Sequence, residues 1–299
     1  MKNKFILAIA SALALLLLAA CGGSQTSDEP FIIGAIPDQD PEKLQREYSH
    51  LADYLSDELG VPVEFKAVTD YPASVSAFRV GDLDMVWFGG LTGVQARLQV
   101  DGAEAILQRG LDEAFTSVFI ASIDSGIPVL DSADELDVLK GHTFTFGSES
   151  STSGRLMPQS FLNQAGVTLA DFEGEPGFSG AHDKTIALVE SGSFEAGALN
   201  SQVWYDRVEA GEVDLSKVQL ILETPTYHDY HWVVRPDIAE RYGEDFSQKV
   251  VDAFLSLDAS NSDEAQILDF FGAERFIVSE NGNYAQIEAV GREVGLISE

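Results

Sequence analysis

The sequence contains little cysteine and few basic residues, and each shortage excludes a class of protein. Cys21 is the only cysteine among 299 residues, so no disulfide can form within the chain. The 18 lysines and arginines are outnumbered by 49 aspartates and glutamates, and the formal net charge is −31. Because such a chain repels the phosphates of nucleic acids, we expect no nucleic-acid partner.

Signals for catalysis and metal binding are also scarce. The sequence has no Gly-x-Ser-x-Gly turn that would aim a serine nucleophile. His228 and His231 flank Asp229, but residues three apart in an extended segment face different directions and do not share a zinc ion. We therefore expect no metal and no cofactor, and a binding protein in preference to an enzyme.

The one long apolar run lies at the start of the chain. Residues 5–18 follow Lys2 and Lys4, as in an export signal, and no later stretch approaches the ~18 apolar residues of a membrane helix. Leu-Ala-Ala before Cys21 resembles a bacterial lipobox and implies cleavage there, with diacylglycerol on the cysteine sulfur. We expect residues 1–20 to be a lipoprotein signal peptide and the exported protein to be lipid-anchored at the periplasmic or cell-surface face of the cytoplasmic membrane. An ordinary signal peptide with an unrelated cysteine is the alternative.

The rest of the chain predicts two lobes after a short linker. Residues 21–30 are mostly small and polar and are expected to form a flexible tether. From there on, strand patterns alternate with helical patterns, which predicts an α/β fold with parallel strands and right-handed crossovers. We predict lobe 1 at 31–122 and 231–299 and lobe 2 at 123–230, joined by two crossovers that make a hinge.

The periodicity of apolar residues predicts the individual elements. Strands are expected at 31–36, 61–68, 83–88, 105–108, 116–123, 143–146, 177–178, 196–199 and 218–222. Helices are expected at 43–59, 74–80, 151–164, 182–191 and 202–210, and the pattern after residue 236 is mostly helical.

The most informative segment is the serine-rich turn from Gly147 to Gly154. It follows a strand pattern and precedes a helical one, so hydroxyls and the free N–H groups of a helix N-terminus would converge on an oxyanion. A simple helix cap needs one hydroxyl residue, whereas Ser150, Ser151, Thr152 and Ser153 supply four in a row. The anion site is therefore favoured over the cap. Arg155, in the first helical turn, is expected to point to solvent.

Other candidates lie directly after strands, where open α/β sheets bind ligands. His182 and Asp183 open a helix after a glycine and could face the same anion, although Asp183 could also only charge the helix start. Trp87 and Phe88 have a core position as their alternative. The full set of candidate ligand-binding residues is Tyr71, Trp87, Phe88, Gly89, Ser151, Thr152, Ser153, Gly154, His182, Asp183, Asn200, Gln202 and Asp229.

Four segments together carry a resemblance to a known family: Thr69-Asp70-Tyr71, Trp87-Phe88-Gly89, Ser151-Thr152-Ser153-Gly154 with Pro158, and Gly180-Ala181-His182-Asp183. They resemble the phosphonate/phosphite family of periplasmic binding proteins, which serve ABC importers, and the similarity covers residues 31–296. The resemblance implies a type II periplasmic-binding-protein fold that closes on its ligand about the two crossovers. It also implies membrane permease subunits as partners, a monomeric protein, and oxyanion binding by Tyr71, Ser151, Thr152, Ser153 and His182.

Departures from the family pattern narrow the ligand. A second family tyrosine appears here as Phe115, which has no hydroxyl, and a glutamate that meets an aminoalkyl group appears as Gln202. An aminoalkylphosphonate is therefore disfavoured, although Asp229 is a possible acidic partner. In detail the sequence most resembles a subgroup described as selenate-binding.

The sequence leaves open which oxyanion is bound. The candidates are selenate, sulfate, phosphite, phosphate and methylphosphonate. Selenate and sulfate only accept hydrogen bonds near neutral pH, whereas phosphorus oxyanions can carry a P–OH group that needs an acceptor. A ligand-facing Asp183 or Asp229 would favour a phosphorus oxyanion. The alternative function is an enzyme on the same fold, of the cofactor-precursor synthase or transferase type, with His182 as its reactive group.

Overall fold

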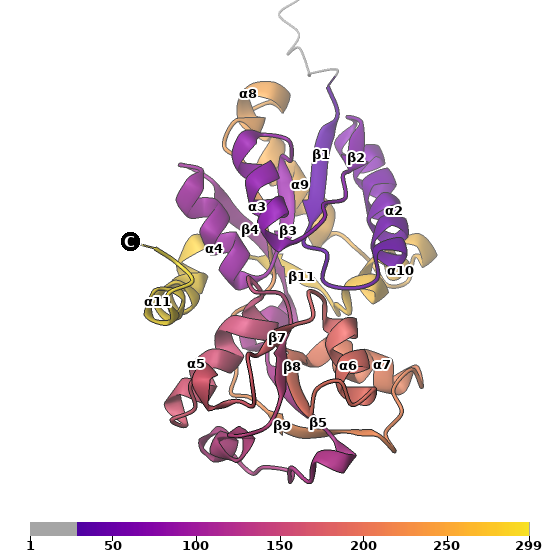
Figure 1. The fold of residues 1–299 in the computed structure, drawn as a ribbon. Coiled ribbons are helices and arrows are strands. Elements are labelled where there is room, and N and C mark those ends of the chain that lie inside the picture. Colours follow the sequence, from indigo (N-terminus) through magenta and orange to yellow (C-terminus); the bar gives the residue numbers. More distant parts are fainter. Residues whose placement is uncertain (1–28, 299) are drawn as a thin grey trace, which may run out of the picture.

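The computed structural model describes residues 29–298, which form two lobes stacked end to end (Figure 1). The predicted signal peptide, most of the predicted tether, and Cys21 lie outside the described residues. Within the described part, none of the helices combines the length and the apolar character that crossing a membrane requires.

Lobe 1 is built on a six-stranded sheet with the strand order β11-β4-β10-β3-β1-β2. Strand β1 is parallel to β2 and β3, whereas β10 and β11 run antiparallel to their neighbours. The strands are β1 (Phe31–Ala35), β2 (Val63–Phe65), β3 (Met85–Phe88), β4 (Glu104–Arg109), β10 (His231–Val234) and β11 (Phe276–Val278). The helices are α2 (Pro41–Leu59), α3 (Tyr71–Val80), α4 (Gly90–Gln99), α8 (Ile238–Tyr242), α9 (Phe246–Leu255), α10 (Ser262–Phe271) and α11 (Ala285–Val294).

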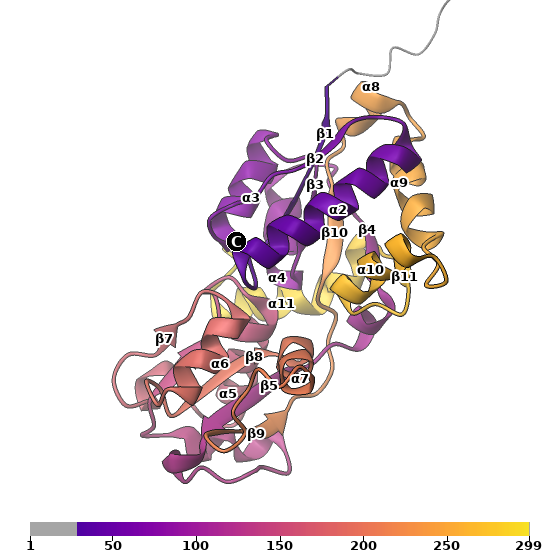
Figure 2. The same ribbon diagram turned by 90° about the vertical axis from the view of Figure 1, so that its right-hand side faces the viewer.

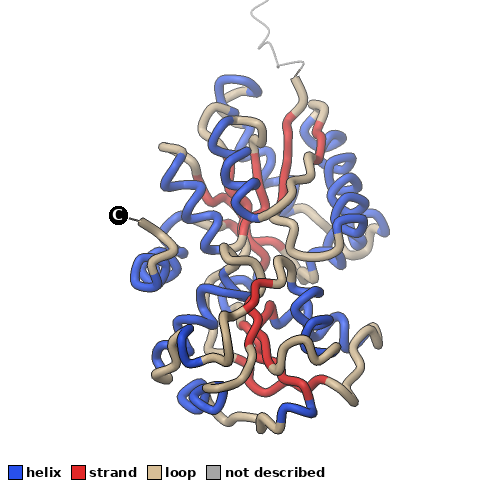
Figure 3. Tube along the Cα trace, in the orientation of Figure 1, coloured by secondary structure: helices blue, strands red, loops and turns tan. Residues whose placement is uncertain are grey.

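Lobe 2 is built on a five-stranded sheet with the order β7-β6-β8-β5-β9 (Figure 3, red). Its strands are β5 (Ser117–Ser122), β6 (Phe144–Phe146), β7 (Gly177–Phe178), β8 (Ala196–Asn200) and β9 (Val218–Glu223). Its helices are α5 (Met157–Gln164), α6 (His182–Glu190) and α7 (Ser201–Glu209), with a π-helical turn η4 (Thr152–Leu156) before α5. Short 3-10 turns in lobe 2 are η2 (Ile123–Ser125), η3 (Ala133–Leu139) and η5 (Leu169–Asp171); η1 (Gly110–Ala114) follows β4, and η6 (Asn281–Tyr284) lies in lobe 1.

Local sequence explains the longest helix, α2, which lies across one face of the lobe 1 sheet (Figure 2). The Asp40 side chain accepts a hydrogen bond of 2.9 Å from the Lys43 amide, and proline occupies the first helical position. Gly60 ends the helix in the left-handed conformation that glycine adopts without strain. A buried stripe that includes Leu44, Leu51 and Leu55 faces the sheet.

The structure corrects the predicted boundary between the lobes. The sequence analysis places the strand at 116–123 in lobe 1. In the structure this strand, β5, pairs antiparallel with β8 and β9 in the sheet of lobe 2. Lobe 2 therefore begins at Ser117 and not at residue 123. Apolar alternation marks a segment as a strand, but the sheet that it joins depends on partners far away in the sequence.

Helix α4, strand β10 and edge strand β11 of lobe 1 were not predicted, and for α4 and β11 the reason is local. Helix α4 contains Gly93, which weakens a helical pattern. A Cβ atom there would lie 2.3 Å from the His231 ring, so the glycine permits close packing. Edge strand β11 has only three residues, too few to show a period.

The two crossovers between the lobes run side by side and are bridged. Phe115 and Tyr227 exchange backbone hydrogen bonds of 2.8 and 2.9 Å, one residue from each crossover. The connecting segments are thus a short two-stranded hinge, as the two-crossover prediction required.

Candidate functional site

The predicted site lies where the two lobes meet, and hydrogen bonds join the lobes across it. The Leu91 amide at the start of α4 donates to Thr152 Oγ1 at 2.9 Å. The His182 amide at the start of α6 donates to the Asp38 carbonyl, also at 2.9 Å. Residues from loops that follow strands of both sheets are therefore brought together, as the strand-end rule predicted.

The serine-rich turn begins with a π-helical turn and not with an α-helix. The Leu156 amide donates to the Ser151 carbonyl at 2.9 Å, which is an i to i−5 bond. This wider turn leaves one more amide without its helical partner than an α-helix would. Ser151 Oγ accepts from the Gly154 amide at 2.9 Å and fixes the turn. The segment from Ser151 to Gly154 is therefore capped, with the Ser151 amide bonded to the Ser148 carbonyl and the Gly154 amide to Ser151 Oγ.

Two glycines let the turn fold tightly against His182. The Gly147 amide donates to the Gly154 carbonyl at 2.8 Å. A Cβ atom at Gly154 would lie 3.1 Å from the Gly147 Cα and 3.2 Å from the His182 ring. Side chains at these two positions would push the histidine and the serine-rich turn apart.

Tyr71 supplies a buried hydroxyl from lobe 1. The residue is 1% exposed, and its hydroxyl has no hydrogen-bond partner within the described protein. Burial raises the pKa of Tyr71 well above its usual value, and the nearby Asp38 raises it further, while the Ser151 hydroxyl lowers it. Tyr71 is thus a neutral donor.

His182 is a neutral donor as well. The Asn200 amide donates to His182 Nδ1 at 3.3 Å, which assigns the proton to Nε2. Nε2 lies 3.3 Å from the Tyr230 hydroxyl. Burial lowers the pKa of His182 to about 3, so the ring carries no charge at neutral pH. A histidine of this kind donates a hydrogen bond but is a poor general base.

Asp229 places a carboxyl group beside these donors. Its Oδ1 accepts from the Gly90 amide at 2.8 Å, whereas Oδ2 is buried without a partner in the described residues. Burial raises the pKa of Asp229 to about 7; the Gly90 amide and Thr152 act against that rise. A Cβ atom at Gly89 would lie within 3.3 Å of both Thr152 Oγ1 and Asp229 Oδ1, so the two side chains are neighbours.

Four residues outside the list of candidates also lie at the candidate site: Tyr230, Asp38, Arg109 and Asp112. The Tyr230 hydroxyl donates to Asp38 Oδ2 at 3.1 Å and accepts from the Asn200 side chain at 3.0 Å. Burial raises the pKa of Asp38 to about 6. Arg109 pairs with Asp112 at 2.6 Å, and both are buried. Asp38 lies three residues after the end of β1, so the strand-end rule points to it as well.

The remaining candidates occupy varied places. Trp87 stacks on Tyr230, with 5.7 Å between ring centroids, and so lines the cleft. Phe88 is fully buried and packs edge-on against Phe78 of α3, which is the core alternative. Asp183 Oδ2 lies 3.7 Å from Arg207, and its Oδ1 is buried without a partner in the part of the chain that the structure describes.

Gln202 points away from the serine-rich turn. Its side-chain amide donates to the Phe271 carbonyl at 3.1 Å, and its oxygen accepts from Arg109. The residue therefore links α7 of lobe 2 to lobe 1. The expectation that Arg155 points to solvent is wrong. The residue is 7% exposed, and its guanidinium lies over the rings of Phe146 and Phe178.

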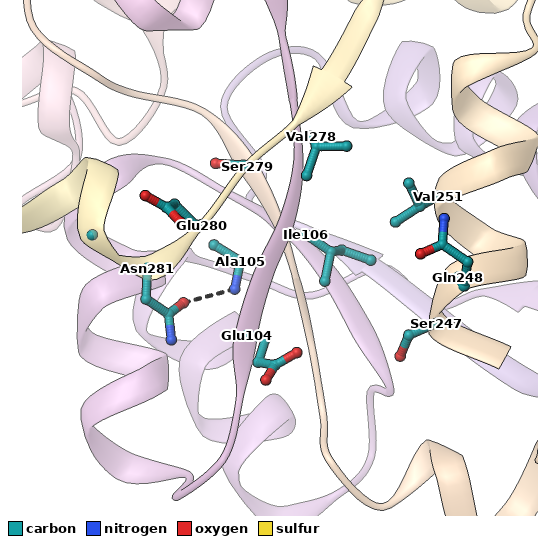
Figure 4. Close-up of a pocket in the computed structure, with 11 residues that line it drawn as sticks. Glu104, Ala105, Ile106, Ser247, Gln248, Val251, Val278, Ser279, Glu280 and Asn281 are labelled. Carbon is teal, nitrogen blue, oxygen red and sulfur yellow. Dashed lines mark hydrogen bonds between the residues drawn. The ribbon is translucent and has the colours of Figure 1, made fainter. Parts of the chain in front are cut away.

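Two cavities differ in their position relative to the candidate residues. A cavity of about 60 Å³ lies between the lobes and is lined by Asp38, Trp87, Arg109, Gln202 and Tyr230, among others. A larger cavity of about 590 Å³ lies between β4, β11 and α9 (Figure 4). None of the candidate residues lines it, so its size does not make it the site. In the described part of the chain, no cluster of three or more His, Cys, Asp or Glu side chains could hold a metal.

Comparison with known proteins identifies relatives of the whole folded part. Residues 33–284 match the family model of the periplasmic substrate-binding protein of the phosphonate ABC transporter. The chain is 47% identical over 266 residues to a probable ABC transporter phosphite binding protein, PhnD1 of Prochlorococcus marinus (strain MIT 9301), and the match covers 89% of this chain and 90% of the relative. The phosphate-import protein PhnD of Mycolicibacterium smegmatis is 28% identical, over 72% of this chain and 71% of its own.

The structural comparison gives the same relative. The structure of PhnD1 from Prochlorococcus marinus (MIT 9301) in complex with methylphosphonate superposes with a TM-score of 0.88 at 46% identity. The match covers 90% of this chain and 100% of that one.

Proposed function

This chain belongs to the family of periplasmic substrate-binding proteins of phosphonate ABC transporters, and from that premise we propose that it captures phosphite or methylphosphonate between its lobes. The predicted family and type II fold are confirmed by this membership. The protein is the substrate-binding component of an importer and not an enzyme. The neutral state of His182 agrees with that conclusion.

The observation that carries the ligand proposal is the free, buried carboxylate oxygen of Asp229. It lies among neutral donors, where an oxyanion with a P–OH group finds an acceptor for its proton and donors for its other oxygens. Sulfate and selenate have no proton to share, and at a pH above about 7, where Asp229 is ionised, they would meet the carboxylate as a like charge. The choice of a phosphorus oxyanion over selenate rests on this argument.

The small size of the ligand has separate support. The cavity beside the site is about 60 Å³, and the stacked rings of Trp87 and Tyr230 wall it. The relative at 47% identity is described as a phosphite binding protein, and its structure holds methylphosphonate. We assign the oxyanion to the donors Tyr71, Ser151, Thr152, Ser153 and His182, with Asp229 as acceptor.

Calorimetry of wild-type protein and an Asp229→Asn variant tests the ligand. We expect phosphite and methylphosphonate to bind the wild type more tightly than sulfate or selenate. The asparagine keeps the shape and can still accept from the Gly90 amide, but it places an NH2 donor where the free Oδ2 acceptor was, so phosphite should lose at least about tenfold in affinity while sulfate and selenate gain. Asp245→Asn, which removes an exposed acid paired with Lys249 of α9, is the charge-matched control. A wild type that prefers selenate or sulfate would contradict the proposal.

The same variant gives a pH readout with a defined sign. The folded protein keeps the Asp229 proton up to about pH 7, whereas the unfolded chain loses it at about pH 4. The contribution of this carboxyl to stability is therefore full below about pH 4 and lost as the pH rises to about 7. The melting temperature of wild type relative to Asp229→Asn should fall between about pH 5 and about pH 8.

We further infer that the mature protein is a monomer held at the membrane through lipid on Cys21, where it serves the permease. The inference rests on the sequence around Cys21, because that residue lies outside the described structure.

A further inference from the structure

Arg109, at the end of β4, is buried among aromatic rings and hydrogen-bond acceptors. Its guanidinium lies 5.5 Å from the Trp87 ring, 5.6 Å from the Phe115 ring and 5.0 Å from the Tyr230 ring. Its Nε and Nη2 donate to the two oxygens of Asp112 at 2.7 and 2.6 Å. The residue is 4% exposed.

Phe271 of lobe 1 and Gln202 of lobe 2 complete the surroundings of Arg109. Arg109 Nη1 donates to the Phe271 carbonyl at 2.7 Å and to the side-chain oxygen of Gln202. Gln202 comes from α7 of lobe 2 and itself donates to the same Phe271 carbonyl. Aromatic faces, one carboxylate and two carbonyl oxygens are the groups that recognise an organic cation. In this protein the cation that these groups surround is the guanidinium of Arg109.

The enclosure of Arg109 adjoins the oxyanion site through a single side chain. The Tyr230 ring covers Arg109, while the hydroxyl of the same tyrosine contacts Asn200, His182 and Asp38. Arg109 and Tyr230 also line the small interlobe cavity. A tail attached to an oxyanion held by His182 would extend past Tyr230 into this space.

We propose that Arg109 is a specificity-determining residue whose guanidinium occupies the place that a cationic ligand tail would take, so that aminoalkylphosphonates are excluded. The proposal rests on the proposed function in one respect, the phosphorus oxyanion. It assigns a role to the Arg109–Asp112 pair beyond holding the hinge together. Removal of Arg109 then leaves an enclosure with Asp112 ready for an external ammonium group.

Matched ligands separate the size of a tail from its charge. We would titrate methylphosphonate, ethylphosphonate and 2-aminoethylphosphonate into the wild type, Arg109→Ala and Arg109→Ala/Asp112→Asn. The wild type should bind 2-aminoethylphosphonate at least about tenfold more weakly than ethylphosphonate. Arg109→Ala should reverse this preference, and the double variant should not, because it lacks the countercharge. Gln202→Ala, which keeps Arg109, should retain the wild-type order.

Failures of the two proposals are distinguishable. Absence of methylphosphonate binding to the wild type contradicts the proposed ligand class. An unchanged preference in Arg109→Ala overturns the role of Arg109. If Arg109→Ala is too unstable to titrate, the double variant, which removes both charges of the buried pair, should still gain ethylphosphonate affinity; no gain overturns the proposal.

A second readout needs no phosphorus ligand. Millimolar methylammonium should raise the melting temperature of Arg109→Ala by several degrees, because it enters the enclosure beside Asp112. It should leave the wild type and the double variant unchanged. Equal effects on all three proteins would show that the enclosure does not take a cation and would overturn the inference.

Discussion

Two buried tyrosines differ in whether their hydroxyl has a hydrogen-bond partner, and we expect one hydroxyl to serve stability and the other to serve ligand binding. The Tyr227 hydroxyl lies 2.6 Å from Ser117 Oγ, which in turn donates to the Ser153 carbonyl. The Tyr71 hydroxyl has no such partner in the described protein. A buried donor without a partner reduces the stability of a fold, so its presence in the cleft is best explained by a ligand that accepts from it.

The first prediction compares these tyrosines. Tyr71→Phe should lower phosphite affinity about ten- to a hundredfold, since a hydrogen bond to a charged group contributes about 1.5–3 kcal/mol. It should not lower the free energy of unfolding of the ligand-free protein. Tyr227→Phe should instead reduce that free energy by about 1 kcal/mol. Calorimetry and urea unfolding measure the two effects, and unchanged affinity in Tyr71→Phe would remove it from the site.

At the scale of elements, the helix expected at 151–164 is two pieces, the π-turn η4 and helix α5. The hydroxyl residues that suggested an anion site also serve the fold, since Ser151 caps the turn and Thr152 joins the lobes. The cap and the anion site are alternatives in the sequence; the structure shows the cap, and the anion site stays a prediction. Losing these hydroxyls would therefore affect stability as well as binding.

Gly154→Ala tests the geometry of this turn without removing a hydroxyl. The added Cβ meets the Gly147 Cα at 3.1 Å, so we expect a loss of about 1–3 kcal/mol in stability and at least about tenfold weaker binding. Gly282→Ala is the control, because the nearest atom to its Cβ lies 3.6 Å away; its effect should stay within about 0.5 kcal/mol. Normal binding by Gly154→Ala would show that the close packing is unimportant.

On the scale of the whole molecule, a protein with a net charge of −31 binds an anion. The surface acids act through solvent and are screened within about 10 Å at moderate salt. The cleft is different, because its donors are neutral and buried and the lobes close around them. Local hydrogen bonding therefore decides binding, while the overall charge keeps the protein soluble.

The proposed lipid anchor also belongs to this scale. Wild-type protein should partition with membranes in an expressing bacterium, and Cys21→Ser should appear in the soluble exported fraction, because the substitution removes the sulfur that we propose is acylated. Ser24→Ala, three residues away, should stay with the membranes. Membrane retention of Cys21→Ser would exclude this anchor.

The sequence by itself determined most of the strands and helices and their alternation, the two-lobed α/β class and the serine-rich turn. These follow from local periodicity, caps and composition, which need only neighbouring residues. Only the tertiary structure decided that β5 joins lobe 2, that Gln202 contacts Arg109, and that Tyr230 lies among the site residues. The physical reason is that sheet pairing, burial and the loss of hydrogen-bond partners are relations between residues far apart in the chain, and folding alone brings them together.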